Sequence, residues 1–137
     1  MRVVFDTNVI LDAVLERADY KSAQALVLAA AADQIDGVIT ANSITDIYYI
    51  ARKFIGDQGA RQMVANVLTV FDIAEVNGEI CAMALNVPMS DYEDAVLAVC
   101  AKEEGSDYIA TSDKKFIETE NLVPAKHPNE LLELLGM

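Results

Sequence analysis

Residues 1–12 read MRVVFDTNVILD and predict a strand, an acidic turn and a helix. The run from Arg2 to Phe5 is rich in β-branched residues, and apolar residues return from Val9 onward at spacings that suit one face of a helix. In an open parallel sheet, the carboxyl ends of the strands face the crevice where ligands bind. Asp6 directly follows the strand and is therefore a candidate for chemistry. Capping of the helix by Asp6, Thr7 or Asn8 is the alternative.

The alternation of strands and helices continues along the chain. Further strands are expected at residues 38–40, within 70–76, at 108–111 and, weakly, at Leu122 and Val123, and a turn is expected at Asp36 and Gly37. Helices are expected at 9–16, about 19–33, 42–55, 57–68, 79–85 and 90–105, in a short stretch ending near 117, and at 129–135; Gly56 separates two of them. This order predicts one domain over residues 1–137, an α/β three-layer sandwich with a mostly parallel sheet of about five strands.

The composition limits the classes of ligand. The 137 residues are 53% hydrophobic, enough for a core, and 10 basic against 22 acidic residues give a formal charge of −12. This charge is the opposite of the basic footprint of proteins that bind nucleic acid by electrostatics. Either the ligand is not a polyanion, or cations intervene. The absence of a bilayer-spanning apolar run and of a signal-peptide pattern predicts a cytoplasmic protein with no membrane partner.

The cysteines and the histidine give little sign of a soft-metal site. Cys81 and Cys100 lie among apolar residues without a CxxC pattern and are expected to be buried small hydrophobes, not a disulfide. His127 lies between Lys126 and Pro128 in a late loop and is expected to have a surface role.

Acidic residues recur where the predicted strands end. Asp6 follows the first strand, Asp46 lies early in the helix after the second, and Asp113 follows the strand at 108–111. Asp94, at the start of the preceding helix, can reach the same edge. Each has a simpler explanation, because the helix dipole favours Asp in a first turn by about 0.3–1 kcal/mol. A chain with 22 acids will place several there by chance.

Carboxylates that converge repel one another unless protons or cations neutralise them. Hard oxygen ligands favour Mg²⁺ or Mn²⁺, whereas one histidine and no thiolate pair are a poor ligand supply for zinc. Mg²⁺ binds through a few carboxylates and substrate phosphate, which is an arrangement that can hydrolyse a phosphodiester. A metal ion would also explain how an acidic protein binds a polyanion.

Four segments resemble the PIN domain family, particularly the ribonuclease toxins of toxin–antitoxin pairs. They are VVFDTNVILD at 3–12, SITDI at 43–47, DAVLAVCA at 94–101 and YIATSDKKF at 108–116, in the order the family has them. The resemblance implies a sheet flanked by helices, a Mg²⁺ or Mn²⁺ site at its acidic edge, and cleavage of RNA that leaves 5′-phosphate and 3′-hydroxyl ends.

The resemblance also assigns roles to the acids. Asp6 corresponds to the central metal ligand, Asp94 to its partner, and Asp113 to the last acid, which acts directly or through water. Asp46 is counted with the catalytic acids, although many members of the family have Glu there, so its reach to the metal is in question. Asp91 lies one helical turn before Asp94 and is a second-rank metal ligand.

Polar and basic neighbours complete the expected site. Asn8, Thr111 and Ser112 are candidates for positioning water, phosphate or carboxylate, with capping or turn formation as the alternative. The bases expected to border the site are Arg17, Lys21, Arg52, Lys53, Lys114 and Lys115, each of which can equally lie on a solvated helix face. Tyr48, Tyr49 and Tyr92 are candidates for stacking on unpaired bases, and for Tyr48 the favoured alternative is that it faces the core.

Two other functions compete with the nuclease. Phosphatases of the haloacid-dehalogenase type also have Asp after their first strand, but they require a second Asp two positions later, where this chain has Asn8. The second alternative is a PIN-like scaffold with an impaired site that binds RNA or protein. The resemblance also implies a homodimer and a small cognate antitoxin that covers the acidic groove.

Overall fold

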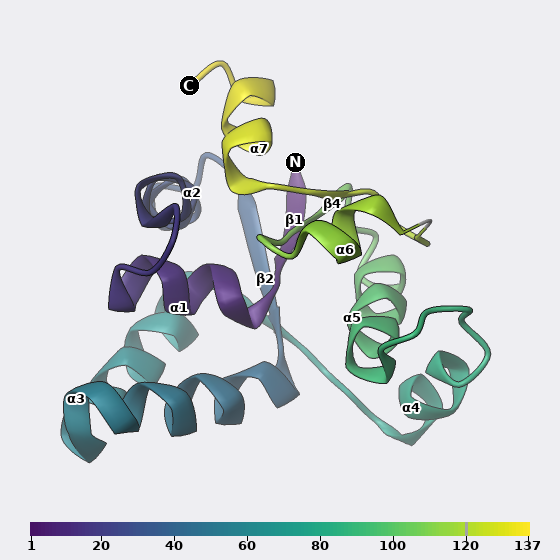
Figure 1. Cartoon of the computed structure of the whole chain (residues 1–137), viewed down its shortest axis with the longest axis horizontal. Coiled ribbons are helices and arrows are strands. Elements are labelled where there is room, and N and C mark those ends of the chain that lie inside the picture. Colours follow the sequence, from purple (N-terminus) through teal and green to yellow (C-terminus); the bar gives the residue numbers. More distant parts are fainter. Residues whose placement is uncertain (120) are drawn as a thin grey trace.

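The computed structural model describes residues 1–119 and 121–137, in which strands and helices alternate as predicted (Figure 1). The strands are β1 (Arg2–Phe5), β2 (Asp36–Thr40), β3 (Asp72–Ala74), β4 (Tyr108–Ala110) and β5 (Ala125–Lys126). The helices are α1 (Thr7–Leu15), α2 (Tyr20–Ala31), α3 (Ala41–Val70), α4 (Gly78–Ala84), α5 (Tyr92–Glu103), α6 (Lys114–Glu118) and α7 (Pro128–Leu134).

The strands form one parallel sheet in the order β3-β2-β1-β4-β5, with β1 at its centre. Val4 of β1 is in register with Val38 of β2 on one side and with Ile109 of β4 on the other. The outer pairs, β2 with β3 and β4 with β5, are also parallel. The predicted parallel sheet of about five strands is therefore confirmed. Its strands all end at one edge, where α1, α3 and α6 begin.

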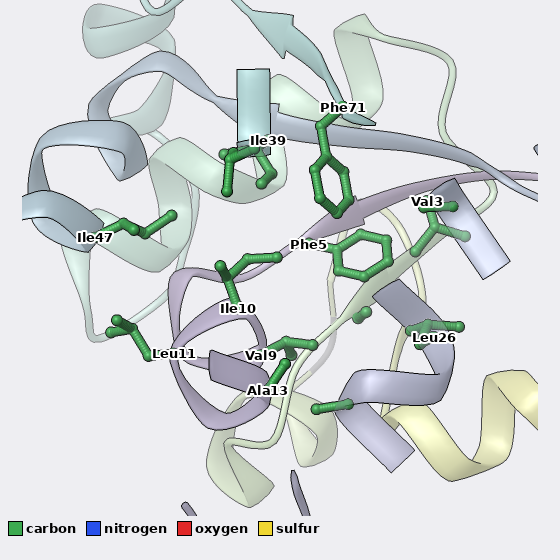
Figure 2. Close-up of a cluster of buried hydrophobic side chains, with 14 of the residues drawn as sticks. Val3, Phe5, Val9, Ile10, Leu11, Ala13, Leu26, Ile39, Ile47 and Phe71 are labelled. Atoms are coloured by element: carbon green, nitrogen blue, oxygen red, sulfur yellow. The ribbon is translucent and has the colours of Figure 1, made fainter. Parts of the chain in front are cut away.

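Side chains of the central strand alternate between two buried layers. Val3 and Phe5 pack with residues of α1, α2 and α3, whereas Val4 packs with residues of α5 and α6 on the opposite face. Figure 2 shows Phe5 beside Phe71 and Ile10 in the first layer; the two phenyl rings are 4.9 Å apart, edge to face. Figure 1 shows α4 and α5 on the other side of the sheet from α1, α2 and α3. The predicted three-layer sandwich is confirmed.

Gly56 divides α3 into two helical arms, residues 41–55 and 57–70, as predicted. Its backbone has φ 77° and ψ 174°, a combination that interrupts the helix and that residues with a Cβ rarely adopt. A glycine at this position therefore allows the polypeptide to change direction between two helices.

Three strand predictions were wrong in detail. Asp36 and Gly37 do not form a turn but begin β2; a Cβ on Gly37 would lie 2.7 Å from the Phe71 ring, so this glycine serves close packing. The strand expected within 70–76 is only Asp72–Ala74, since Val70 still belongs to α3. The last strand is Ala125–Lys126, not Leu122–Val123.

Both cysteines are free, and Cys100 is buried while Cys81 is partly buried, so the expectation of no disulfide is confirmed for this pair. His127 caps the start of α7, where its Nδ1 accepts a hydrogen bond from the backbone N–H of Asn129. None of the helices described is both long enough and apolar enough to span a bilayer.

Candidate active site

A cleft of about 410 Å³ opens at the edge of the sheet where β1, β2 and β4 end. Its acidic lining comes from five parts of the chain: the ends of β1 and β4, the first arm of α3, the start of α5 and the residue before it. We call it the acidic cleft; its acids are Asp6, Asp46, Asp91, Glu93, Asp94 and Asp113. The structure thus brings together all five acids that the sequence singled out, and it adds Glu93.

Asp6 is held at the floor of the cleft by a hydrogen bond and not by capping of α1. It occupies the N-cap position, but its side chain makes no capping hydrogen bond. Instead, Thr111 Oγ1 donates to Asp6 Oδ2 at 2.8 Å, and the same hydroxyl accepts from the backbone N–H of Asp113 at 3.1 Å. Burial raises the pKa of Asp6, and the negative charge of Asp113 raises it further. Thr111, a predicted positioning residue, therefore connects the ends of β1 and β4.

Asp91 and Asp94 form the acidic start of α5. Asp91 is the N-cap residue, and its Oδ1 accepts from the backbone N–H of Asp94 at 3.2 Å. Burial raises the pKa of Asp94 to about 7, together with the negative charges of Asp91, Asp6, Asp113 and Glu93. This large shift indicates that the acids are close enough to repel one another.

Glu93 faces Asp46 across the cleft. The pKa of Glu93 is raised, first because its carboxyl group shares a hydrogen bond with that of Asp46 and then because it is buried. Glu93 was not among the predicted site residues, although its position in the same first turn as Asp94 is a signal that could have identified it.

Asp113 has two roles at once. Its Oδ1 caps α6 by accepting from the backbone N–H groups of Lys115 at 3.0 Å and Phe116 at 3.4 Å, and its side chain also lines the cleft. Asp113 therefore both caps α6 and contributes a carboxylate to the acidic cleft.

The remaining predicted residues lie beside the cleft. Asn8 lines the acidic cleft and also an adjoining pocket of about 280 Å³. Ser112 lines only that adjoining pocket, where its hydroxyl donates to Asp12 Oδ2 at 3.1 Å. Asp12 is buried and was also missed from the sequence. An acid surrounded by apolar helix residues such as Leu11 and Ala13 is a signal of such burial.

The basic residues lie outside the acidic cleft, and Lys115 borders it as expected, because Lys115 lines a small neighbouring pocket together with Asp91, Asp94 and Asp113. No Lys or Arg of the described residues lines the acidic cleft itself. Arg17 lines the adjoining pocket. Arg52 lies over the rings of Tyr48 and Tyr49. Lys114 Nζ lies 3.8 Å from Glu118 Oε1. Tyr48 packs partly buried against the core as expected, whereas Tyr49 is exposed.

The donor chemistry of the cleft fits a hard divalent cation, because carboxylate oxygens dominate its walls. In their present orientations, however, no three His, Cys, Asp or Glu side chains of residues 1–119 and 121–137 are grouped closely enough to hold a metal ion. An ion shared by three carboxylates would therefore require side chains to change rotamer. His127 lies outside the cleft, so the lining offers no zinc-type ligand set.

A model of the PIN domain matches residues 2–115 of the chain. The chain belongs to the PIN domain family. The resemblance seen in the sequence is thus confirmed, and the phosphatase alternative has no support. No curated protein sequence matches the chain significantly.

Several solved structures share the fold at low sequence identity. The VapBC2 complex of Rickettsia felis, bound to promoter DNA, has a TM-score of 0.67 at 15% identity, covering 93% of this chain and 98% of that one. The VapC20 toxin of Mycobacterium tuberculosis, which cleaves the sarcin–ricin loop, has a TM-score of 0.66 at 14% identity. The match covers 83% of this chain and 92% of that one. A DNA-bound VapBC of Salmonella typhimurium has a TM-score of 0.68 at 12% identity, and the match covers 93% of this chain and 98% of that one.

Proposed function

We propose that this PIN domain protein is an endoribonuclease that depends on Mg²⁺ or Mn²⁺ and acts as the toxin of a toxin–antitoxin pair. The observation that supports this most directly is the acidic cleft, in which carboxyl groups from distant segments raise one another's pKa. Such a cluster is tolerated when cations neutralise it. The similarity in fold to VapC toxins supports the same function.

In this proposal, Asp6, Asp94 and Asp113 hold the metal, with Asp91 as a further ligand. A bound divalent ion would lower the pKa of an attacking water and offset negative charge on the phosphate. Thr111 fixes one oxygen of Asp6, so the other oxygen can face the cleft. The buried hydroxyl group of Thr111 therefore orients Asp6 in the proposed metal site.

Asp46 and Glu93 have a separate proposed role. The neighbouring carboxyl group of Asp46 raises the pKa of Glu93, so the pair favours a proton on Glu93 inside the cleft. Such a pair can give up or accept a proton within the cleft, which suits general acid or base catalysis. Asn8 lines the same cleft and can donate through its side-chain amide to phosphate or water.

Removing a carboxylate tests the proposal. We expect Asp94→Asn, and likewise Asp6→Asn, to reduce Mn²⁺-dependent cleavage of single-stranded RNA by at least about a hundredfold, because a metal ligand is lost. The measurement is a time course on gels with purified protein, with circular dichroism to check folding. Asp33→Asn is a matched control, since Asp33 is an exposed acid in the turn before β2, at the far end of the strands. Cleavage that survives in both cleft variants would refute the assignment.

A scaffold with an impaired site is the second candidate. Two observations favour it: Asp46 stands where many family members have Glu, and three acids are not yet grouped as a metal site among the described residues. Titration calorimetry with Mn²⁺ separates the candidates, with Asp6→Asn as the control. Metal-dependent heat that disappears in the variant supports the nuclease, and no such heat in the unmodified protein supports the scaffold.

The proposed toxin role also includes partners. We propose a homodimer, RNA as substrate, a cognate antitoxin and action in the cytoplasm, where toxin and RNA would meet. Complexes named VapBC among the similar structures support the antitoxin part of this proposal. Light scattering of the purified protein tests the dimer.

A further inference from the structure

A second polar pocket adjoins the acidic cleft, and the guanidinium group of Arg17 lines it. This side pocket has a volume of about 280 Å³, and its polar lining is Asn8, Asp12, Arg17, Asp19, Ser112 and His127. Asn8 belongs to both the side pocket and the acidic cleft. Among the described residues that line either of them, Arg17 is the only Lys or Arg. A positive charge is therefore present directly beside a strongly negative cleft.

Two side chains hold the guanidinium of Arg17 in place. Its Nε donates to Asp12 Oδ1 at 3.1 Å, and its Nη2 donates to Asn8 Oδ1 at 3.3 Å. The Asp12 side chain is only 10% exposed, and its other oxygen accepts from Ser112. Arg17 itself remains 37% exposed, and its Nη1 has no hydrogen-bond partner within residues 1–119 and 121–137. One edge of the guanidinium is thus fixed, while the other is available to a ligand.

The backbone around Arg17 is strained in a way that supports this placement. Glu16 and Ala18, on either side of it, have φ angles of 53° and 43°, in the left-handed region that residues other than glycine rarely adopt. The backbone N–H of Arg17 donates to Asp12 O at 3.1 Å, which returns the chain over the end of α1. Strained residues of this kind persist where the surrounding structure requires them, often at binding sites.

We infer that Arg17 binds a backbone phosphate of the RNA strand, adjacent to the phosphodiester in the acidic cleft; this inference rests on the proposed ribonuclease function. A guanidinium matches phosphate geometry through paired N–H groups, and fixing it in advance reduces the entropy lost on binding. The walls of the acidic cleft repel phosphate, so a cation beside the cleft adds to the charge compensation that the proposed metal provides. Asp12 is a positioning residue in this arrangement, because it contacts Arg17 and not the RNA.

The other charges of the side pocket leave this edge of Arg17 accessible. Asp19 is the second acid of the pocket, and its Oδ2 lies 3.5 Å from His127 Nε2. It is directed to the imidazole and makes no ion pair with Arg17 among the described residues. The negative charge of Asp12 acts on the Nε edge. The Nη1 edge therefore remains the side to which a phosphate oxygen can bind.

The test compares two arginines that each pair with an aspartate. Arg17→Gln removes the proposed contact, and Arg61→Gln is the matched control, because Arg61 pairs with Asp57 on the exposed surface of α3. Both are made in the otherwise unmodified protein, and Ca²⁺ replaces Mn²⁺ so that the cleft keeps all its proposed ligands while RNA is not consumed. Fluorescence anisotropy then measures binding of a labelled single-stranded RNA oligonucleotide of mixed sequence at several salt concentrations.

We expect Arg17→Gln to weaken RNA binding about tenfold, as for loss of one hydrogen-bonded charge. The slope of log affinity against log salt should fall by about 0.7, the value for one phosphate contact on a single strand. Arg61→Gln should change neither quantity. A purely structural role would lower the melting temperature without changing the salt slope. Arg17→Lys provides a second variant that keeps the charge: it should weaken binding but leave the slope unchanged.

The outcomes separate this inference from the proposed function. If the unmodified protein cleaves RNA but Arg17→Gln binds RNA as Arg61→Gln does, the role of Arg17 is overturned and the nuclease remains. If the unmodified protein neither cleaves nor binds RNA, the proposed function is overturned, and the role of Arg17 with it.

Discussion

Asp94 shows how a single residue of the acidic cleft is affected by its neighbours. Its pKa of about 7 results from burial and from the charges of Asp91, Asp6, Asp113 and Glu93, so ionising it is unfavourable in the folded protein without metal. In the unfolded chain the same carboxyl group ionises near its ordinary pKa of 3.8. The folded state therefore binds a proton more tightly than the unfolded state does. Its contribution to stability is present below pH 4 and is lost as the pH rises through 7.

Asp94→Asn should remove this pH dependence. We expect the metal-free variant to be more stable than the unmodified protein at pH 8, by about 1 kcal/mol after allowance for solvent screening of a partly exposed group. At pH 4 the two proteins should be nearly equally stable. Urea unfolding at both pH values with EDTA present measures the difference, and Glu133→Gln, at an exposed acid of α7, controls for loss of one surface charge. An equal effect of Asp94→Asn at both pH values would show that ionisation of Asp94 does not cause the difference.

The residues of the candidate site were only partly predictable from the sequence. Asp6, Asp46 and Asp113 could be found because the carboxyl ends of parallel strands meet at one edge. Asp12 and Glu93 could not be placed so simply. Their roles depend on contacts with Ser112 and Asp46, which are distant in sequence, and helical periodicity does not reveal such contacts.

At the scale of elements, local signals were reliable for helices and less so for strands at the edge of the sheet. Gly56 indicated the break in α3 because its effect is confined to the backbone of one residue. The position of β5 depends instead on pairing of Ala125 with Ile109 across the sheet. Val123 is buried without being in a strand, so its hydrophobicity misled the prediction.

The turn after α1 offers a test of backbone strain. Ala18 has φ 43°, where a Cβ is unfavourable by about 1–2 kcal/mol. Ala18→Gly should relieve this strain and stabilise the protein by roughly 0.5 kcal/mol, since the greater freedom of glycine in the unfolded chain offsets part of the gain. Ala25→Gly, within α2, is the matched control and should destabilise by about 1 kcal/mol. Thermal unfolding of both variants measures this contrast, and destabilisation by Ala18→Gly would show that Ala18 is not strained.

Across the whole molecule, the acids at the two ends of the sheet differ in whether they form ion pairs. At the amino ends of the strands, the single positive charge of Arg2 is shared by Asp36, Asp72 and Glu104, which all pair with it. At the carboxyl ends, no acid of the acidic cleft forms an ion pair with a Lys or Arg among the described residues. Six of the 22 acids thus lie together where the proposed metal would bind, without a paired cation in the described part of the chain.

Divalent cations should therefore stabilise the fold specifically. An ion that binds only the folded state contributes about 2.7 kcal/mol at a hundred times its Kd. For a chain of this length that corresponds to a rise in Tm of about 10 °C. Differential scanning calorimetry with Mn²⁺, against NaCl at the same ionic strength, measures the specific part. Asp6→Asn should lose most of the rise, whereas Asp33→Asn should retain it. An equal rise in Tm with NaCl, or an equal rise in Asp6→Asn with Mn²⁺, would mean that Mn²⁺ only screens the surface charge. The acidic cleft would then not be a metal site.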